Sequence, residues 1–160
     1  MAKLAIGKAP TSFPLTVKIQ TPHGEDEIVF DAKHLPSTEW AKLREAHTEV
    51  INKQVNSLFD AARKEAEKAY DKQADDEKKH SADEKELAIE ALRKPVKESE
   101  IKALRAKSSA SLILKIVNKW DLEDEFTDPV LVQMCDLYHA APDAIFNGYG
   151  DALTGTRLGN

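Results

Sequence analysis

Residues 116–160, IVNKWDLEDEFTDPVLVQMCDLYHAAPDAIFNGYGDALTGTRLGN, contain the signals that decide the fold of this chain. The Thr-Asp-Pro sequence at residues 127–129 offers capping oxygens followed by a proline, which is typical of a helix start. Pro142 indicates a second helix start, and Gly155 is typical of a helix end. Two short amphipathic helices do not bury their apolar stripes alone, so we expect them to pack on another helix or on another chain.

The helix that precedes these two is expected to begin at Glu98 or Ser99 and to continue to Trp120. Apolar residues recur in this segment near i+3 and i+4 spacing, which predicts a helix buried on a wide face. The large apolar residues that we expect in the core of the domain are Trp40, Leu43, Leu112, Ile116, Trp120 and Phe126.

Two short strands are expected near the N-terminus, after an extended and mobile arm at residues 1–14. Apolar and polar residues alternate over residues 15–20, and a second apolar run follows at residues 27–32. Pro22 and Gly24 supply turn chemistry between them. The pattern predicts a β-hairpin, which is marginal alone in water and therefore has to pack on helices.

The middle of the chain is helical in pattern but lacks the apolar residues of a core. A helix start is expected at Ser37 or Thr38, and residues 63–86 are mostly Lys, Arg, Asp and Glu of mixed sign. Ser81 and Glu84 have the spacing of a capping box. We therefore expect a helical hairpin with its tip near His80, which is either a solvated protrusion or an arm that faces a partner.

The predicted fold class is mainly α (α+β), with a small N-terminal β-hairpin packed on a helical domain and a long charged helical protrusion inserted mid-chain. We expect one domain, residues 1–160. Its core is expected at about residues 9–60 and 97–160, and the charged insertion at residues 61–96.

The charge and the hydropathy of the chain argue against two classes of partner. The formal net charge is −5, whereas binding to nucleic-acid phosphates normally needs a basic surface. No apolar run approaches the roughly 20 residues of a membrane helix, and the first residues show no hydrophobic signal segment. We expect a soluble, cytosolic protein that binds neither nucleic acid nor membrane.

Residues with catalytic or metal-binding potential are few and scattered. The chain has five His and one Cys, and they form no nucleophile and base arrangement and no metal-ligand spacing. Cys135 lies in an apolar run and is expected to be buried, and His47 is expected to be a partly buried neighbour of the core. The acids at residues 121–125 lack the pattern of a calcium loop. We expect no enzyme activity, no metal and no cofactor.

At these residues the chain resembles the tail assembly chaperones of long, non-contractile-tailed bacteriophages and their prophage-encoded relatives. The resemblance covers residues 9–51 and about 112–160, and it depends on the order and spacing of short motifs. These motifs are Pro10-Thr11-Ser12-Phe13 before two strands, Ile116-Val117-Asn118-Lys119-Trp120-Asp121-Leu122 with Glu125-Phe126, Tyr138 near a small-residue break, Ala144-Ile145-Phe146 with Tyr149, and the final Arg157-Leu158-Gly159-Asn160. The charged region at about residues 53–107 resembles an insertion, about which the resemblance implies nothing.

The resemblance implies a non-enzymatic role in tail morphogenesis inside the host bacterial cytoplasm. Such chaperones bind the tape measure protein, keep it soluble and recruit the major tail tube protein, and they tend to form homo-oligomers. A structural or adaptor protein retained in the phage tail is the alternative. The apolar residues expected to contact a partner are Val130, Met134, Leu137, Tyr138, Phe146 and Tyr149, and the other interpretation of each is a place in the protein's own core.

Overall fold

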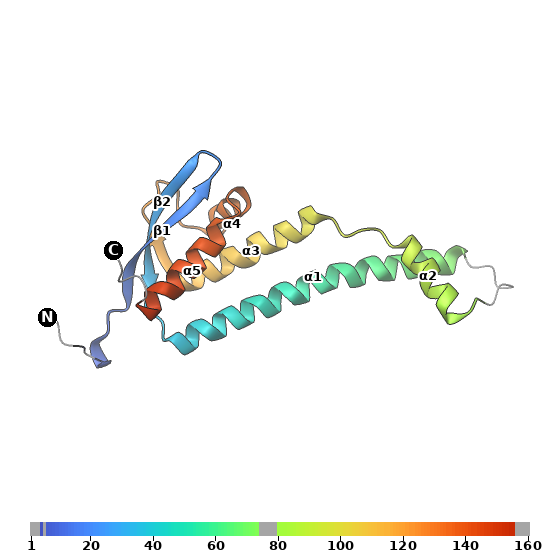
Figure 1. Cartoon of the computed structure of the whole chain (residues 1–160), viewed down its shortest axis with the longest axis horizontal. Coiled ribbons are helices and arrows are strands. Elements are labelled where there is room, and N and C mark those ends of the chain that lie inside the picture. The colour runs from blue at the N-terminus through green and yellow to red at the C-terminus, as the bar shows by residue number, and fades with distance from the viewer. Residues whose placement is uncertain (1–3, 5, 74–79, 156–160) are drawn as a thin grey trace. The chain divides into compact units, whose positions relative to one another are not determined.

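The computed structural model describes residue 4, residues 6–73 and residues 80–155. It is mainly helical, with one antiparallel sheet of three strands in the order β1-β2-β3 (Figure 1). The predicted fold class is confirmed. The elements are η1 (Ile6–Lys8), β1 (Ser12–Thr21), β2 (Gly24–Lys33), α1 (Ser37–Gln73), α2 (Ala82–Leu92), α3 (Glu98–Ile116), β3 (Val117–Trp120), α4 (Asp128–Leu137) and α5 (Ala141–Thr154).

The chain forms two compact units. The first consists of residues up to Thr48 together with residues from Arg105 onwards, and the second consists of residues 49–104. Helices α1 and α3 each contribute to both units. The charged insertion expected at residues 61–96 lies inside the second unit.

The predicted hairpin is present in the first unit and is longer than expected. Strands β1 and β2 pair in antiparallel register from Ser12 opposite Lys33 to Thr21 opposite Gly24. Gly24 has a φ of 136°, a conformation that glycine adopts without strain. The arm expected at residues 1–14 is wrong in its last part, because β1 already begins at Ser12.

One face of the hairpin is buried, as the alternation of its residues predicts. The side chains on that face pack into a core that α3, α4 and α5 complete, and α5 packs against β1 (Figure 1). The buried strand residues are Leu15, Val17, Ile19, Ile28, Phe30 and Ala32.

The third strand corrects the prediction of a helix that continues to Trp120. Helix α3 ends at Ile116, and residues Val117–Trp120 form β3, which pairs with β2. Trp120 lies opposite Phe30 in this pairing, and the Asn118 side chain donates to Asp31 over 3.2 Å. The free edge of β2 thus determines the local structure, which the apolar periodicity of the sequence does not reveal.

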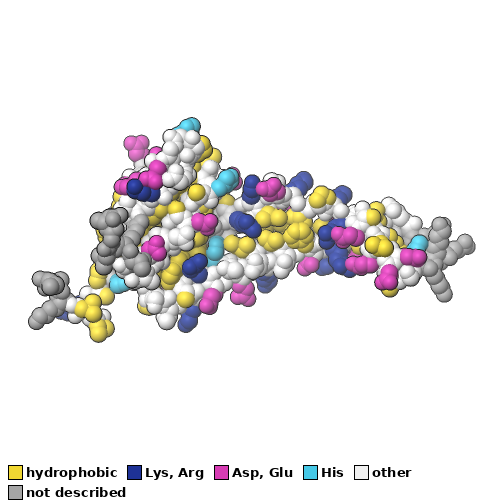
Figure 2. Space-filling view, in the orientation of Figure 1, with side chains coloured by type: hydrophobic (Ala, Val, Ile, Leu, Met, Phe, Trp, Pro, Cys, Tyr) yellow, Lys and Arg dark blue, Asp and Glu magenta, His cyan; other side chains and the backbone are white. Residues whose placement is uncertain are grey.

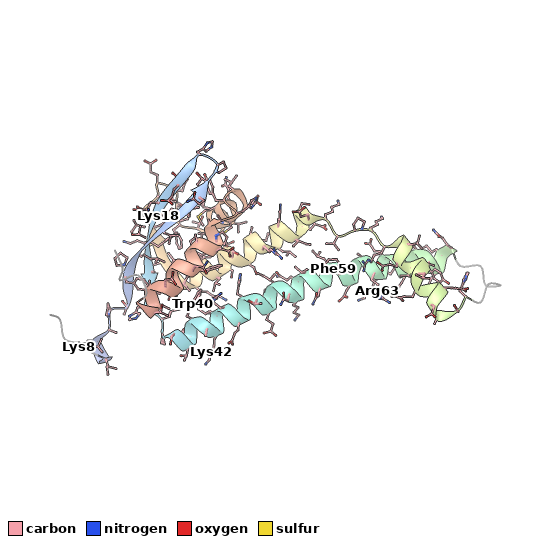
Figure 3. The ribbon with its side chains drawn as sticks, viewed as in Figure 1. Lys8, Lys18, Trp40, Lys42, Phe59 and Arg63 are labelled. Atoms are coloured by element: carbon pink, nitrogen blue, oxygen red, sulfur yellow. The ribbon has the colours of Figure 1, made fainter. Side chains whose placement is uncertain are left out.

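The second unit contains a pair of helices with mixed charges on its surface. Arg63 of α1 forms ion pairs with Glu67 at 3.1 Å and with Glu86 of α2 at 3.0 Å (Figure 3). Lys85 lies 5.6 Å from the centre of the Tyr70 ring. Acidic and basic side chains are interspersed around α2 (Figure 2). These contacts are those of a helical hairpin, and the segment next to its expected tip, residues 74–79, lies outside the described residues.

The capping box predicted at Ser81 is confirmed. The Ser81 hydroxyl accepts from the Glu84 amide at 3.2 Å, and the Ser81 amide donates to the Glu84 carboxylate at 3.1 Å. Helix α2 ends at Leu92, shortly before Pro95.

An aromatic cluster joins the sheet, α1 and α5 within the first unit. The Tyr149 ring lies 4.9 Å from the Trp40 ring and 6.0 Å from the Phe13 ring, measured between centroids. The Tyr149 hydroxyl donates to the Lys33 carbonyl oxygen at 2.7 Å, and burial raises the pKa of this hydroxyl. Tyr149 therefore stays protonated and acts as a donor at neutral pH.

Replacing Tyr149 by Phe is expected to destabilise the first unit by about 1–2 kcal/mol, because the Lys33 carbonyl loses its partner in a buried place. Denaturant unfolding followed by tryptophan fluorescence measures this change. The matched control is Tyr138→Phe, whose side chain is 37% exposed. The control should change the free energy of unfolding by less than about 0.5 kcal/mol. Equal effects of the two substitutions would contradict the assigned role of Tyr149.

Replacing residues 63–94 by a flexible Gly/Ser linker is expected to leave the first unit folded, because its core residues lie outside this segment. Circular dichroism and cooperative thermal unfolding measure the outcome. A shortened chain that loses cooperative unfolding would show that the second unit is needed for the stability of the first.

Candidate functional site

Helices α4 and α5 hold all six residues that the sequence indicates as partner contacts. Thr127 has extended backbone before α4, with φ −129°, and Pro129 lies in the first turn as expected. The capping oxygen predicted at Thr127 is not used, because its side chain makes no cap hydrogen bond and its carbonyl oxygen accepts from Leu131 instead. Helix α5 ends as predicted at Gly155, with φ 70°.

Helix α4 has one buried side and one exposed side. Leu131, Met134 and Cys135 are buried, at the i, i+3 and i+4 spacing of a core-facing stripe. Burial raises the pKa of the Cys135 thiol to about 12, as expected for a packing residue. On the opposite side Leu137 is 59% exposed and Val130 is half-buried. The core thus takes one side of α4 and leaves the other free.

The six candidates separate by burial. Met134 and Tyr149 are 6% and 0% exposed, so they are core residues and do not present their side chains to a partner. For these two residues the prediction of a partner contact is corrected. Phe146 is half-buried between the rings of Trp40 and His47, at 6.3 and 5.6 Å. Phe146 also contributes mainly to the interior.

Three candidates remain at the surface and lie together on one helix. Val130 and Leu137 are seven residues apart on the same side of α4, and Tyr138 follows at the end of the helix. We call these three residues the α4 apolar surface. Exposed apolar side chains grouped in this way are typical of an interaction site.

The six residues expected in the core lie in it or at its border. Trp40, Leu112 and Ile116 are buried, at 7%, 3% and 0% exposure. The other three, which are half-buried and pack against the same core, are Leu43, Trp120 and Phe126. Trp120 also donates from its indole nitrogen to the Asp124 carbonyl oxygen at 2.7 Å, which fixes the turn before α4.

Strongly acidic sequence surrounds the α4 apolar surface. Residues 121–154 contain no Lys or Arg, and their acids are all exposed. These eight acids are Asp121, Glu123, Asp124, Glu125, Asp128, Asp136, Asp143 and Asp151. None of the acids between Glu123 and Asp143 forms an ion pair with a residue that the structure describes. This part of the first unit therefore carries a negative potential that its own cations do not neutralise.

Asp121 has a structural role that the sequence pattern did not reveal. Its backbone amide donates to the Val29 carbonyl oxygen at 3.1 Å, and its carboxylate accepts from the Val29 amide at 3.0 Å. The side chain thus extends the edge of the sheet where β3 ends. The signal for this role is a short polar residue directly after a strand, and it was hidden because β3 was expected to be helical.

A shallow hollow of about 470 Å³ lies on the sheet where β2 and β3 meet. It is lined by Pro14, Val29, Phe30, Asp31, Lys119, Trp120 and Asp121. The carboxylates of Asp31 and Asp121 already accept hydrogen bonds from Asn118 and from the Val29 amide. The hollow is therefore a feature of the sheet surface rather than an assembled catalytic site.

The remaining titratable groups provide neither a metal centre nor a general base. His47 is half-buried, and desolvation, with smaller contributions from Lys115 and Arg44, lowers its pKa. Over residues 6–73 and 80–155, no three His, Cys, Asp or Glu side chains are grouped so as to bind a metal ion. No helix in the described part of the chain has the length and apolar character needed to span a membrane.

Comparisons with known proteins identify the family. Neither the curated proteins nor the solved structures gave a match. A family model described as phage tail assembly chaperone matches residues 1–160, which is the whole chain and includes the charged region at residues 53–107. The chain therefore belongs to the phage tail assembly chaperone family.

Proposed function

We propose that this chaperone binds the tape measure protein, keeps it soluble and helps to recruit the major tail tube protein during tail morphogenesis, in the cytoplasm of the bacterial host. The observation that carries the proposal is the family match over the whole chain. Family membership also implies a non-enzymatic role, so the action we propose is stoichiometric binding.

The α4 apolar surface agrees with this function in physical terms. A long helical client exposes apolar side chains before it is packed into a tail, and a chaperone has to offer apolar side chains that cover them. Leu137 and Tyr138 are 59% and 37% exposed, and Leu122 before α4 is also 37% exposed. Burial of such residues on a client stabilises the complex by roughly 25 cal/mol for each Å² of apolar surface removed from water.

We further propose that the chain forms homo-oligomers. Apolar side chains are exposed on the second unit as well, where Val50, Phe59 and Leu87 are 46%, 41% and 73% exposed (Phe59 is labelled in Figure 3). An oligomer would cover part of this surface and would give a long client several equivalent contacts.

Co-expression with the tape measure protein of the same phage tests the main proposal. The soluble fraction of the tape measure protein is expected to increase severalfold, and the two proteins are expected to co-purify, because the chaperone covers apolar client surface. Quantitative immunoblotting of soluble and pelleted fractions measures the effect, and an empty vector is the control.

Two outcomes would contradict the proposal. A tape measure protein that is equally insoluble with and without the chain would remove the proposed activity. Detection of the chain by mass spectrometry at a constant copy number in purified virions would instead indicate a structural protein retained in the tail.

Self-association is tested separately by light scattering of the purified chain over a wide range of concentrations. The mean mass is expected to rise above that of the 17.8 kDa monomer as concentration increases. The substitution Phe59→Ser is expected to reduce the rise if the second unit contributes to the contact, because it removes apolar area. A mass that stays monomeric at every concentration would reject the oligomer.

A further inference from the structure

The exposed side of α4 has the form of a short apolar ridge. Val130 and Leu137 are separated by two helical turns, or roughly 10 Å along the axis, and they lie on the same side of the helix. Tyr138, which directly follows α4, continues the ridge. Apolar side chains two turns apart are the contacts that one helix makes along another helix.

Negative charge borders this ridge without a compensating cation from the same segment. Asp136 is adjacent to Leu137 in sequence, and helical geometry places Asp136 and Asp128 on the other flank of the exposed side of α4. The acids at residues 123–125 lead directly into the first turn of α4. A helix that packs on the ridge therefore meets carboxylates along its length and at one end.

We infer that the α4 apolar surface and its acidic border dock a partner helix that carries Lys or Arg beside an apolar stripe. The inference rests on the proposed function, and it specifies the surface and the chemistry of the client segment. Apolar contacts provide affinity, and the carboxylates select basic helices over acidic ones and accelerate association.

The same charges disfavour a second copy of this chain as the occupant. A symmetric contact of α4 with α4 would bring Asp128 and Asp136 of two copies close together, and no Lys or Arg between residues 121 and 154 would separate them. Like charges that lose water in such a contact repel each other strongly.

The test uses the full chain and two synthetic helical peptides with the same apolar stripe, flanked by Lys in one peptide and by Glu in the other. Fluorescence anisotropy of the labelled peptides measures binding at about 50 mM and at about 300 mM salt, because screening weakens contacts between exposed charges. We expect the Lys peptide to bind at least about tenfold more tightly than the Glu peptide. Its affinity should fall severalfold at the higher salt concentration.

Two pairs of variants locate the site. The double substitution Leu137→Ala/Tyr138→Ala should weaken binding of the Lys peptide about tenfold, whereas Leu87→Ala on the second unit should change it less than twofold. The double substitution Asp128→Asn/Asp136→Asn should reduce the salt dependence. The control Glu65→Gln/Glu100→Gln makes the same change in net charge on the second unit and should leave that dependence unchanged.

Three results would overturn the inference. These are equal affinity for the two peptides, equal effects of the variants and their controls, and loss of self-association rather than of peptide binding in the Leu137/Tyr138 variant. The last result would show that this surface joins copies of the chain. Circular dichroism of each variant confirms that a loss of binding is not a loss of folding.

Co-expression separates failure of this inference from failure of the proposed function. If the Leu137/Tyr138 variant keeps the tape measure protein as soluble as the original chain does, the inference is wrong and the function stands. If the original chain does not improve solubility, the proposed function fails whatever the peptides do.

Discussion

The buried Tyr149 side chain is the interaction on which the first unit depends. Its ring packs on Trp40 at the start of α1 and on Phe13 of β1, and its hydroxyl donates to the Lys33 carbonyl oxygen at the end of β2. One residue of α5 thereby fixes the sheet and the first helix relative to it. An aromatic ring provides a large buried area, and the hydroxyl satisfies a carbonyl that the sheet leaves without a partner.

This arrangement divides the work of the C-terminal helices. Helix α5 places Ile145 and Tyr149 in the interior, and α4 contributes Leu131 and Met134 on one side only. The short length of α4 matters here, because ten residues present too few turns to be covered from every direction. The family's role in tail assembly thus finds its candidate contact on the helix that the core covers least.

Much of the fold follows from local patterns, and the misses have one physical origin. Alternation predicted the hairpin, helical spacing predicted α3 to α5, and Ser81 predicted its capping box, because each signal lies within a few residues. Residues 117–120 were expected to be helical since their periodicity resembles that of α3, but pairing with β2 prevails. Burial is equally non-local: Tyr149 and Leu137 have similar sequence surroundings, and only the packing of α5 on β1 distinguishes the core residue from the surface residue.

The pairing of β2 with β3 also imposes an order on the birth of the molecule. Asp31 and Asn118 are 87 residues apart in the chain, and the whole second unit is encoded between them. At roughly 5–20 residues per second on the ribosome, β2 waits about 4–17 s for its neighbour. During this interval the apolar face of the hairpin has none of α3, α4 or α5 to cover it. The chaperone of another protein's assembly thus passes through an exposed stage of its own, whose duration is set by the length of the segment between its two halves.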